Sequence, residues 1–174
     1  IVPVKDINGM LMLATDETIR PGTSPESLSK LMASFEMMGQ MGFDATALDK
    51  YTTIEKIIHA HHAGNSSGIV DGAGAVLVAS PEFAKAHGLR PRARIVAMAT
   101  AADEPIIMLT APTPATQRCL AKAKMKVSDI DLFEINEAFA AIPLKVMRDL
   151  SLDPAKVNVN GGAIALGHPV GASG

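Results

Sequence analysis

The chain has 174 residues, of which 48% are hydrophobic and 20% charged, and its formal net charge is -2. A chain of this composition can bury an apolar core and is not disordered, and its length suits one domain. The small negative charge and the 3% of aromatic residues argue against a nucleic-acid-binding protein, because such proteins normally carry a basic excess or aromatic stacking surfaces.

The single cysteine, Cys119, excludes an internal disulfide and a cysteine-rich metal site, and it is consistent with a reducing compartment. The charge-poor run 157–174 contains glycines, asparagines and a proline, so we do not expect a membrane span there. The chain begins at Ile1 without a signal-peptide pattern and stops at Gly174 inside a Gly-rich turn. We therefore expect a cytoplasmic protein, and we expect the chain to be a piece of a longer polypeptide.

The N-terminal region opens with an apolar segment, residues 1–4, that predicts a strand. Ser24 then suits a helix N-cap, because a proline follows it and apolar residues recur at helical spacing as far as Gly39. The pattern predicts a helix between these two residues, with Gly39 as its end. A weaker helical spacing of apolar residues over 54–61 suggests a second helix.

From residue 65 onward, segments typical of strands and helices alternate. Apolar runs predict a buried strand at 73–79 and further strands at 94–100, 131–135 and 156–160. Helices are predicted at 81–87, 113–125 and 137–150, and Pro143 is expected to bend or break the last of them. This alternation predicts an α/β layered fold in which helices cover a sheet.

Two polar residues lie where two of the predicted strands end. Asn136 directly follows strand 131–135, and His168 follows strand 156–160 after a Gly-rich turn. Reactive side chains of wound α/β sheets gather at the carboxyl ends of strands. If the two strands share a sheet, Asn136 and His168 can therefore converge on one crevice. Each also has a structural interpretation, since Asn136 can be a plain helix N-cap and His168 can simply close a turn.

The sequence around His168 suits a reactive imidazole. Gly161, Gly162 and Gly167 allow a tight turn or a close approach to a ligand, and Pro169 restricts His168 to extended backbone. A helix N-terminus after His168 would disfavour the protonated ring. A neutral imidazole can act as a base toward a thiol or donate a hydrogen bond to a developing oxyanion.

Three motifs in this chain resemble those of thiolases, the acyl-CoA acetyltransferases. The stretch NVNGGAIALGHPVGASG at 158–174 resembles the signature around their catalytic histidine. NEAFA at 136–140 resembles a second marker of the family, and HAGNSSGIVDGA at 62–73 a third. The order and spacing of the three motifs fit the family, and weaker similarity covers the rest of the chain.

The resemblance implies a thiolase-like layered α-β-α fold, built from two similar halves and a loop domain over the site. Residues 1–68 would belong to the loop domain, and residues 69–90 would return to the N-terminal half. Residues 91–174 would form part of the C-terminal half.

The resemblance also implies a reaction, in which an acyl group is transferred between coenzyme A and an acyl-CoA in fatty-acid or lipid metabolism. The reaction is thiolytic cleavage of a 3-ketoacyl-CoA or the reverse Claisen condensation of acetyl-CoA. His168 resembles the histidine that activates the nucleophile and helps form an oxyanion hole, and Asn136 the asparagine that holds a catalytic water. The positions that match the coenzyme A channel are Ala63 and Ser67, and those that match the acyl pocket wall are Met108, Ala138 and Phe139.

The same resemblance implies a homodimer or homotetramer with coenzyme A as substrate and with no metal or redox cofactor. His59, His61 and His62 are too crowded to predict a zinc site. The nucleophilic cysteine of the family lies upstream of Ile1 and its second cysteine beyond Gly174, so we expect the chain alone to be inactive. The alternatives are a related ketoacyl synthase and a non-catalytic thiolase-like protein that binds acyl-CoA or serves as a subunit.

Overall fold

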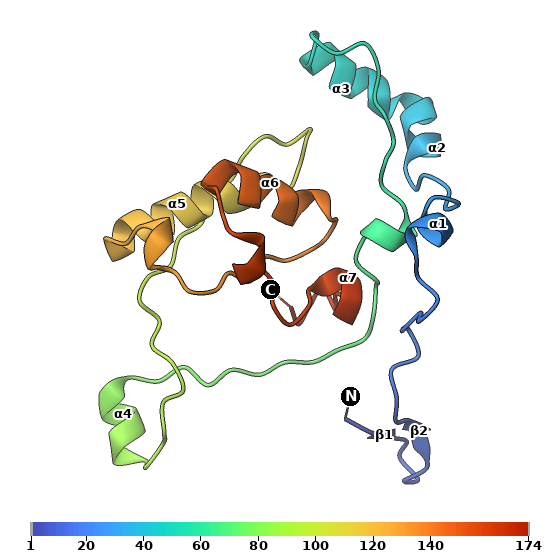
Figure 1. Cartoon of the computed structure of the whole chain (residues 1–174). Helices are drawn as coiled ribbons and strands as arrows, with labels where there is room; N and C mark the ends of the chain where they lie inside the picture. Colours follow the sequence, from blue (N-terminus) through green and yellow to red (C-terminus); the bar gives the residue numbers. More distant parts are fainter. Residues whose placement is uncertain (1, 174) are drawn as a thin grey trace. The chain divides into compact units, whose positions relative to one another are not determined.

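The computed structural model describes residues 2–173 of the chain (Figure 1). The chain folds as two units, Ile1–Leu31 and Met32–Gly174. None of the helices within the described residues combines the length and the hydropathy that crossing a membrane requires.

The first unit begins with a β-hairpin. Strand β1 (Val4–Lys5) pairs antiparallel with β2 (Leu11–Leu13), so the strand predicted at residues 1–4 overlaps an observed one. The Asp6 carboxylate accepts hydrogen bonds of 2.9 and 2.8 Å from two amides of the connecting turn. Gly9 has a φ of +81° in this turn, a conformation that glycine adopts at no steric cost.

Helix α1 (Pro25–Leu28) begins as predicted, because the Ser24 hydroxyl accepts a hydrogen bond of 3.2 Å from the third helical amide. It ends after one turn, so the predicted continuation to Gly39 is wrong. The Ser29 hydroxyl donates to a carbonyl of that turn at 3.0 Å. The apolar residues that would have continued the helix are exposed, Met32 by 87%. Helices depend on packing of their apolar face, and here that packing is missing.

The second unit begins with a helical arm, made of α2 (Glu36–Met38), the π-helical segment η1 (Gly39–Phe43) and α3 (Asp44–Lys50). The arm is kinked at Gly42, which has a φ of +111°. Gly39 lies inside this arm and does not end it. A Cβ atom on Gly39 would lie 2.6 Å from the His59 imidazole. Glycine therefore stands at this position because of close packing.

The segment after the arm forms no helix over 54–61, so that prediction is wrong. Its polar groups bond to other segments: the His61 carbonyl accepts from Ser34 N at 2.8 Å. The short 3₁₀ helix η2 (Ala63–Asn65) follows, and the His62 Nδ1 atom accepts the Gly64 amide at 3.0 Å.

Residues 73–79 and 94–100 do not form the predicted strands. Within the described residues neither segment pairs with another strand, and their apolar side chains are exposed, Val76 by 88%. A strand needs a hydrogen-bonded neighbour, so an apolar run without one stays irregular. Helix α4 (Pro81–Ala86) forms between them as predicted, and Gly88 follows its end with a φ of +62°.

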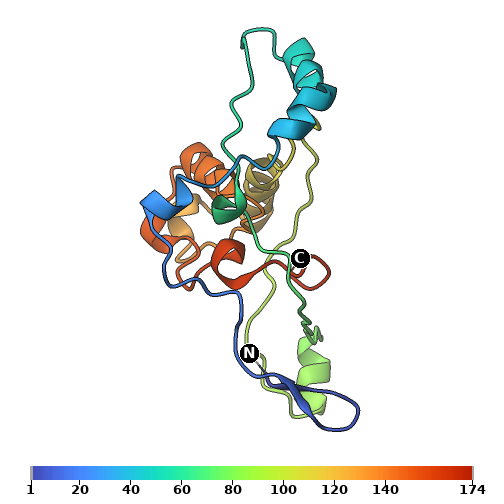
Figure 2. The same cartoon turned by 90° about the vertical axis from the view of Figure 1, so that its right-hand side faces the viewer.

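Helices α5 (Pro112–Ala123) and α6 (Ala141–Leu150) confirm two further predictions and lie side by side (Figures 1 and 2). The Thr113 hydroxyl of α5 donates to the Asp149 carboxylate of α6 at 2.8 Å. Helix α6 begins four residues later than predicted. Pro143 does not bend it, because Pro143 lies in the first turn, where a backbone N–H has no helical partner.

The segments 131–135 and 156–160 lie parallel but pair only at one bridge, Phe133 with Val157. They are therefore strands only at that point. The short 3₁₀ helices η3 (Val127–Asp129) and η4 (Pro154–Lys156) precede them. Helix α7 (Ala163–Leu166), which the sequence did not predict, follows. Val146, Leu152 and Ala163 are buried in this region, with exposed fractions of 3%, 7% and 5%.

Candidate active site

The structure brings His168 and Asn136 together. The His168 Nε2 atom lies 3.3 Å from the Asn136 Nδ2 atom. Asn136 is exposed on the segment that leads to α6, and His168 is half-buried just after α7. The two side chains come from segments joined by the bridge between Phe133 and Val157. This parallel contact brings the ends of the two segments close together.

The other ring nitrogen of His168 is also bonded. Its Nδ1 atom lies 2.5 Å from the Ser173 hydroxyl, which in turn lies 3.2 Å from the Pro169 carbonyl. A carbonyl only accepts, so the Ser173 proton is assigned to Pro169 and the imidazole proton to Nδ1. In this arrangement Nε2 keeps its lone pair and accepts a hydrogen bond from the Asn136 amide.

The backbone of His168 is held by the motif at 62–73. The His168 amide donates to the Gly68 carbonyl at 2.8 Å. Gly167 has a φ of +90°, and a Cβ atom there would lie 2.5 Å from a methyl carbon of Val70. Only glycine combines that backbone angle with so close a neighbour. The turn before His168 is thus shaped by contact with a segment almost one hundred residues earlier in the chain.

The motif at 136–140 contacts the same segment. Ser66 and Phe139 form an antiparallel bridge. The Ser67 amide donates to the Ala138 carbonyl at 3.0 Å, and the Ala140 amide donates to the Asn65 carbonyl at 2.9 Å. All three motifs identified in the sequence therefore meet in the second unit.

The residues predicted to contact substrate divide into two groups. Ser67, Ala138 and Phe139 are half-buried at the junction of the motifs, and Ala63 is exposed on η2. Met108 lies in the loop before α5, 61% exposed and with a φ of +61°. Among the described residues, no hydrogen bond joins that loop to the three motifs.

Phe139 belongs to an aromatic cluster that the sequence did not predict. Its ring centroid lies 4.8 Å from that of His61 and 5.7 Å from that of Phe35, both edge-on. Edge-on contacts of this kind are favourable beyond the area that they bury. The cluster fixes the Phe139 ring beside η2.

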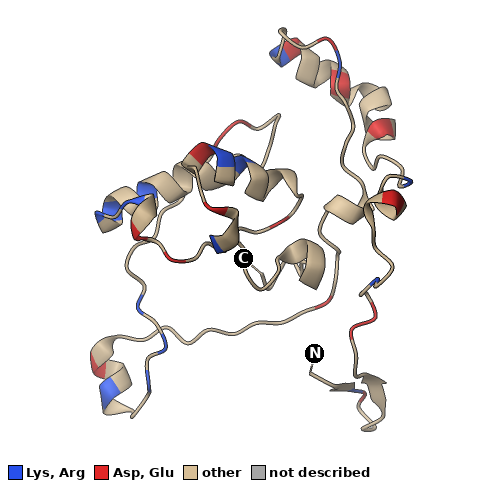
Figure 3. Ribbon diagram, viewed as in Figure 1, with Lys and Arg blue, Asp and Glu red and all other residues tan. Residues whose placement is uncertain are grey.

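An open cavity of about 340 Å³ lies beside the histidine and asparagine pair. Asn136, Gly167 and Ser173 are among its lining residues. Residues 157–173 carry no Lys, Arg, Asp or Glu side chain, and the ribbon of α7 in this region is tan in Figure 3. The cavity wall from this segment is therefore made of glycines, small apolar side chains and hydrogen-bonding groups.

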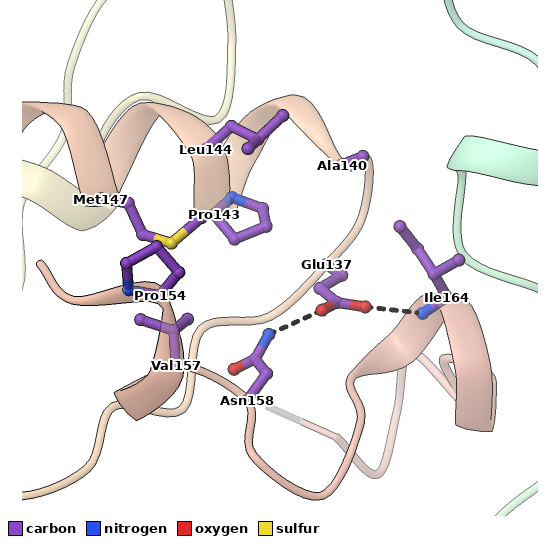
Figure 4. A pocket seen from close by; sticks show the side chains of 9 residues that line it. All are labelled: Glu137, Ala140, Pro143, Leu144, Met147, Pro154, Val157, Asn158 and Ile164. Atoms are coloured by element: carbon purple, nitrogen blue, oxygen red, sulfur yellow. Dashed lines mark hydrogen bonds between the residues drawn. The ribbon is translucent and has the colours of Figure 1, made fainter.

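Glu137 and Asn158 are functional candidates that the sequence did not single out. The Glu137 carboxylate accepts hydrogen bonds from Asn158 Nδ2 at 2.7 Å and from the Ile164 amide at 3.1 Å (Figure 4). A cavity of about 260 Å³ with mainly apolar walls lies beside this group. Both residues lie inside motifs that the sequence analysis identified, and this position could have pointed to them. The spacing of the residues in the sequence does not reveal that they contact each other.

The three histidines at 59–62, which the sequence analysis considered as a metal site, have separate partners. His59 Nε2 lies 3.0 Å from an Asp44 carboxylate oxygen, while His61 and His62 make the contacts described above. No group of three or more metal-ligating side chains within residues 2–173 is arranged to hold a metal ion. Cys119 is half-buried, and its Sγ lies 3.5 Å from the Ala97 carbonyl.

Residues 89–174 match the profile of a family described as "Thiolase, C-terminal domain". The whole chain is 46% identical to the 3-oxoadipyl-CoA/3-oxo-5,6-dehydrosuberyl-CoA thiolase of Escherichia coli (strain K12), of which it covers 40%. An acetyl-CoA acetyltransferase of Thiocystis violacea is 45% identical over 94% of the chain and 36% of that protein.

A solved structure is similar as well, namely human mitochondrial 3-ketoacyl-CoA thiolase in complex with CoA. The TM-score is 0.75 at 43% identity, covering 94% of this chain and 36% of the human chain. This chain belongs to the thiolase family, and its fold is a partial thiolase-like α/β fold. It spans about two fifths of the length of the curated relatives that it matches.

Proposed function

We propose that this chain supplies the histidine and asparagine side of a thiolase active site. The enzyme would cleave a 3-ketoacyl-CoA with coenzyme A, or condense acetyl-CoA in the reverse direction. The observation that carries the proposal is the 3.3 Å contact between His168 Nε2 and Asn136 Nδ2, at the junction of three motifs. The relatives named as thiolases and acetyl-CoA acetyltransferases support the same reaction.

The chemistry follows from the hydrogen bonds of His168. An unprotonated Nε2 atom can accept the proton of a thiol in place of its hydrogen bond from the Asn136 amide, and the resulting thiolate is the nucleophile that attacks a thioester or ketone carbonyl. The protonated ring and the Asn136 amide can then donate hydrogen bonds toward the oxygen that becomes negative. Asn136 can do so directly or through a bound water.

The reacting thiols must come from outside the described residues, because Cys119 bonds to the Ala97 carbonyl. The proposal therefore includes the expectation that this chain alone does not catalyse the reaction.

Coenzyme A is proposed as a substrate that passes Ala63 and Ser67, with its acyl group toward Met108, Ala138 and Phe139. The CoA complex of the human relative supports binding of this ligand. No metal or redox cofactor has a role in the proposed reaction. We further propose a cytoplasmic homodimer or homotetramer that acts in fatty-acid or lipid metabolism.

A second candidate is a non-catalytic thiolase-like protein that binds acyl-CoA or serves as a subunit. It is favoured by the partner of Cys119, since this only cysteine of the chain does not bond to His168. The two candidates differ in turnover and share ligand binding, so one set of measurements separates them.

The test begins with the intact mass of the purified protein that contains this chain. Thiolysis is then measured with 3-ketoacyl-CoA substrates of several chain lengths, and binding of coenzyme A by calorimetry. Turnover supports the thiolase. Binding without turnover supports the second candidate, and the absence of both overturns the proposal.

A further inference from the structure

We propose that Glu137 and Asn158 form a positioning clamp that sets the distance between the Asn136 amide and the His168 imidazole. The inference rests on the proposed thiolase function. Neither clamp residue makes a hydrogen bond to His168. The clamp acts through the backbone segments that carry the two functional side chains.

The Asn158 amide holds the residue directly before Asn136. Its Oδ1 atom accepts the Ile135 amide at 2.7 Å, and its Nδ2 atom donates to the Ile135 carbonyl at 2.9 Å. One side chain thus pairs both backbone groups of Ile135, as a neighbouring strand would. Asn158 has a φ of +47°, which asparagine tolerates better than most residues.

The Glu137 carboxylate links that segment to α7. One oxygen accepts from Asn158 Nδ2 at 2.7 Å, and the other from the Ile164 amide at 3.1 Å (Figure 4). Ile164 lies in the first turn of α7, where the N-cap residue Gly162 has no side chain to cap the helix. Glu137 provides the missing acceptor, and α7 ends two residues before His168.

Gly162, in the turn before α7, lies in close contact with the Glu137 carboxylate. A Cβ atom on Gly162 would overlap the Glu137 carboxyl group. The carboxylate therefore occupies the space that any other residue at this position would fill. Asn136, between the two held residues Ile135 and Glu137, has little freedom to move relative to His168.

The clamp requires a particular arrangement of hydrogen-bond donors and acceptors. Both groups that face the Glu137 carboxylate are N–H donors, so both of its oxygens must accept. In Glu137→Gln the amide nitrogen would face one of these donors, and one hydrogen bond would be lost. In Asn158→Asp a carboxylate would face both Glu137 and the Ile135 carbonyl. Combining the two substitutions lets the glutamine amide donate to the aspartate, which restores the link between residues 137 and 158, while the Ile135 carbonyl still loses its donor.

The test measures kinetics and hydrogen exchange in the thiolase that contains this chain. We expect Glu137→Gln to lower kcat by about 10- to 100-fold, since a small misplacement of catalytic groups has effects of that size. The KM for coenzyme A should change by less than about threefold, because uniform binding is retained. Amide exchange of residues 163–168 should become faster. The matched control is Asp131→Asn, an exposed carboxylate of the same segment, which should change neither readout.

Three outcomes are decisive. Recovery of slow exchange over residues 163–168 and of part of kcat in the E137Q/N158D double variant supports the clamp. A double variant that folds supports it also where E137Q alone does not fold. Wild-type kcat with unchanged exchange in E137Q overturns the clamp, as does an equal loss in D131N. A double variant whose amide exchange over residues 163–168 is no slower than in E137Q also overturns it. A wild-type protein without thiolase turnover contradicts the proposed function instead, and the exchange measurement then decides the clamp alone.

Discussion

Two apolar regions of the second unit begin from similar strand-like sequences and end in different structures. Residues 131–135 and 156–160 meet at the bridge between Phe133 and Val157, and the Asn158 side chain bonds both backbone groups of Ile135. Residues 94–100 have no strand beside them among the described residues. Their carbonyls instead accept bonds from α5 side chains: Arg118 to Thr100 at 3.1 Å and Lys122 to Met98 at 3.0 Å.

The difference in backbone pairing explains why one apolar segment holds a fixed position and the other does not. Backbone polar groups must be paired, and short side chains with a fixed geometry hold them more firmly than long flexible ones, which lose more rotamer entropy when ordered. The first region therefore holds His168 and Asn136 in place, whereas the second keeps its apolar side chains exposed. Five substitutions test this contrast, from the largest expected effect to the smallest.

The first substitution removes the reactive group of the paired region. In the thiolase that contains this chain, His168→Ala should lower kcat/KM by about 10²- to 10⁴-fold, because the base for the thiol is lost. The fold should be retained, which far-UV circular dichroism checks. Near-normal turnover would remove His168 from the mechanism.

Gly167→Ala tests the turn that places His168. The new methyl group would approach Val70 in a backbone conformation that only glycine adopts readily. We expect a loss of about 3 to 4 kcal/mol in the free energy of unfolding, measured by urea titration. The control is Gly171→Ala, since a Cβ there meets nothing within 4 Å. Equal stability of the two variants would contradict the packing of Val70 on this turn.

Leu152→Ala tests the small core behind the paired region. Leu152 is 7% exposed, whereas Leu132 is 58% exposed. Truncation of Leu152 should lower the free energy of unfolding by about 2 to 3 kcal/mol, because a cavity is left behind. Leu132→Ala should change it by less than about 1 kcal/mol. Comparable losses in both would mean that Leu152 is not part of a packed core.

The pH dependence of stability in Asp149→Asn tests the contact between α5 and α6. Hydrogen bonds from Lys145 and Thr113 hold the pKa of the Asp149 carboxyl below its usual value. A lowered folded-state pKa gives stability that is full above the unfolded value of about 3.9 and is lost as the pH falls through the folded value.

Thermal unfolding between pH 7 and pH 2 should therefore show a weaker acid dependence in Asp149→Asn than in the wild type. Asp131→Asn serves as the exposed control. An acid dependence identical to that of the wild type would exclude this contribution of Asp149.

Val96→Lys should have the smallest effect, because Val96 is 67% exposed in the unpaired segment 94–100. Surface substitutions of this kind change the free energy of unfolding of the chain by about 0.5 kcal/mol or less. Urea titration of the chain measures this. A loss above about 2 kcal/mol would show that the segment is packed in solution, and it would remove the contrast between the two regions.

Local signals in the sequence were sufficient for part of this structure. The Ser24 cap and α4 follow from serine caps and prolines that act within a few positions of the chain, and the start of α5 follows from its prolines. The motif residues Asn136 and His168 could also be chosen from the sequence, because chemistry and position after apolar runs pointed to them. The predicted continuation of the first helix to Gly39 was wrong. Such a helix needs its apolar face to be packed, and the spacing of apolar residues does not show whether it is.

The sequence by itself determined the α/β class, the thiolase family and the pair of residues proposed for catalysis, because residue type and short-range order carry that information. Only the tertiary structure decided which apolar runs pair, and it alone placed Glu137 and Asn158 between the two functional segments. Those contacts join groups more than twenty residues apart. Their formation depends on long-range packing, in which each backbone donor and acceptor must find a partner in space.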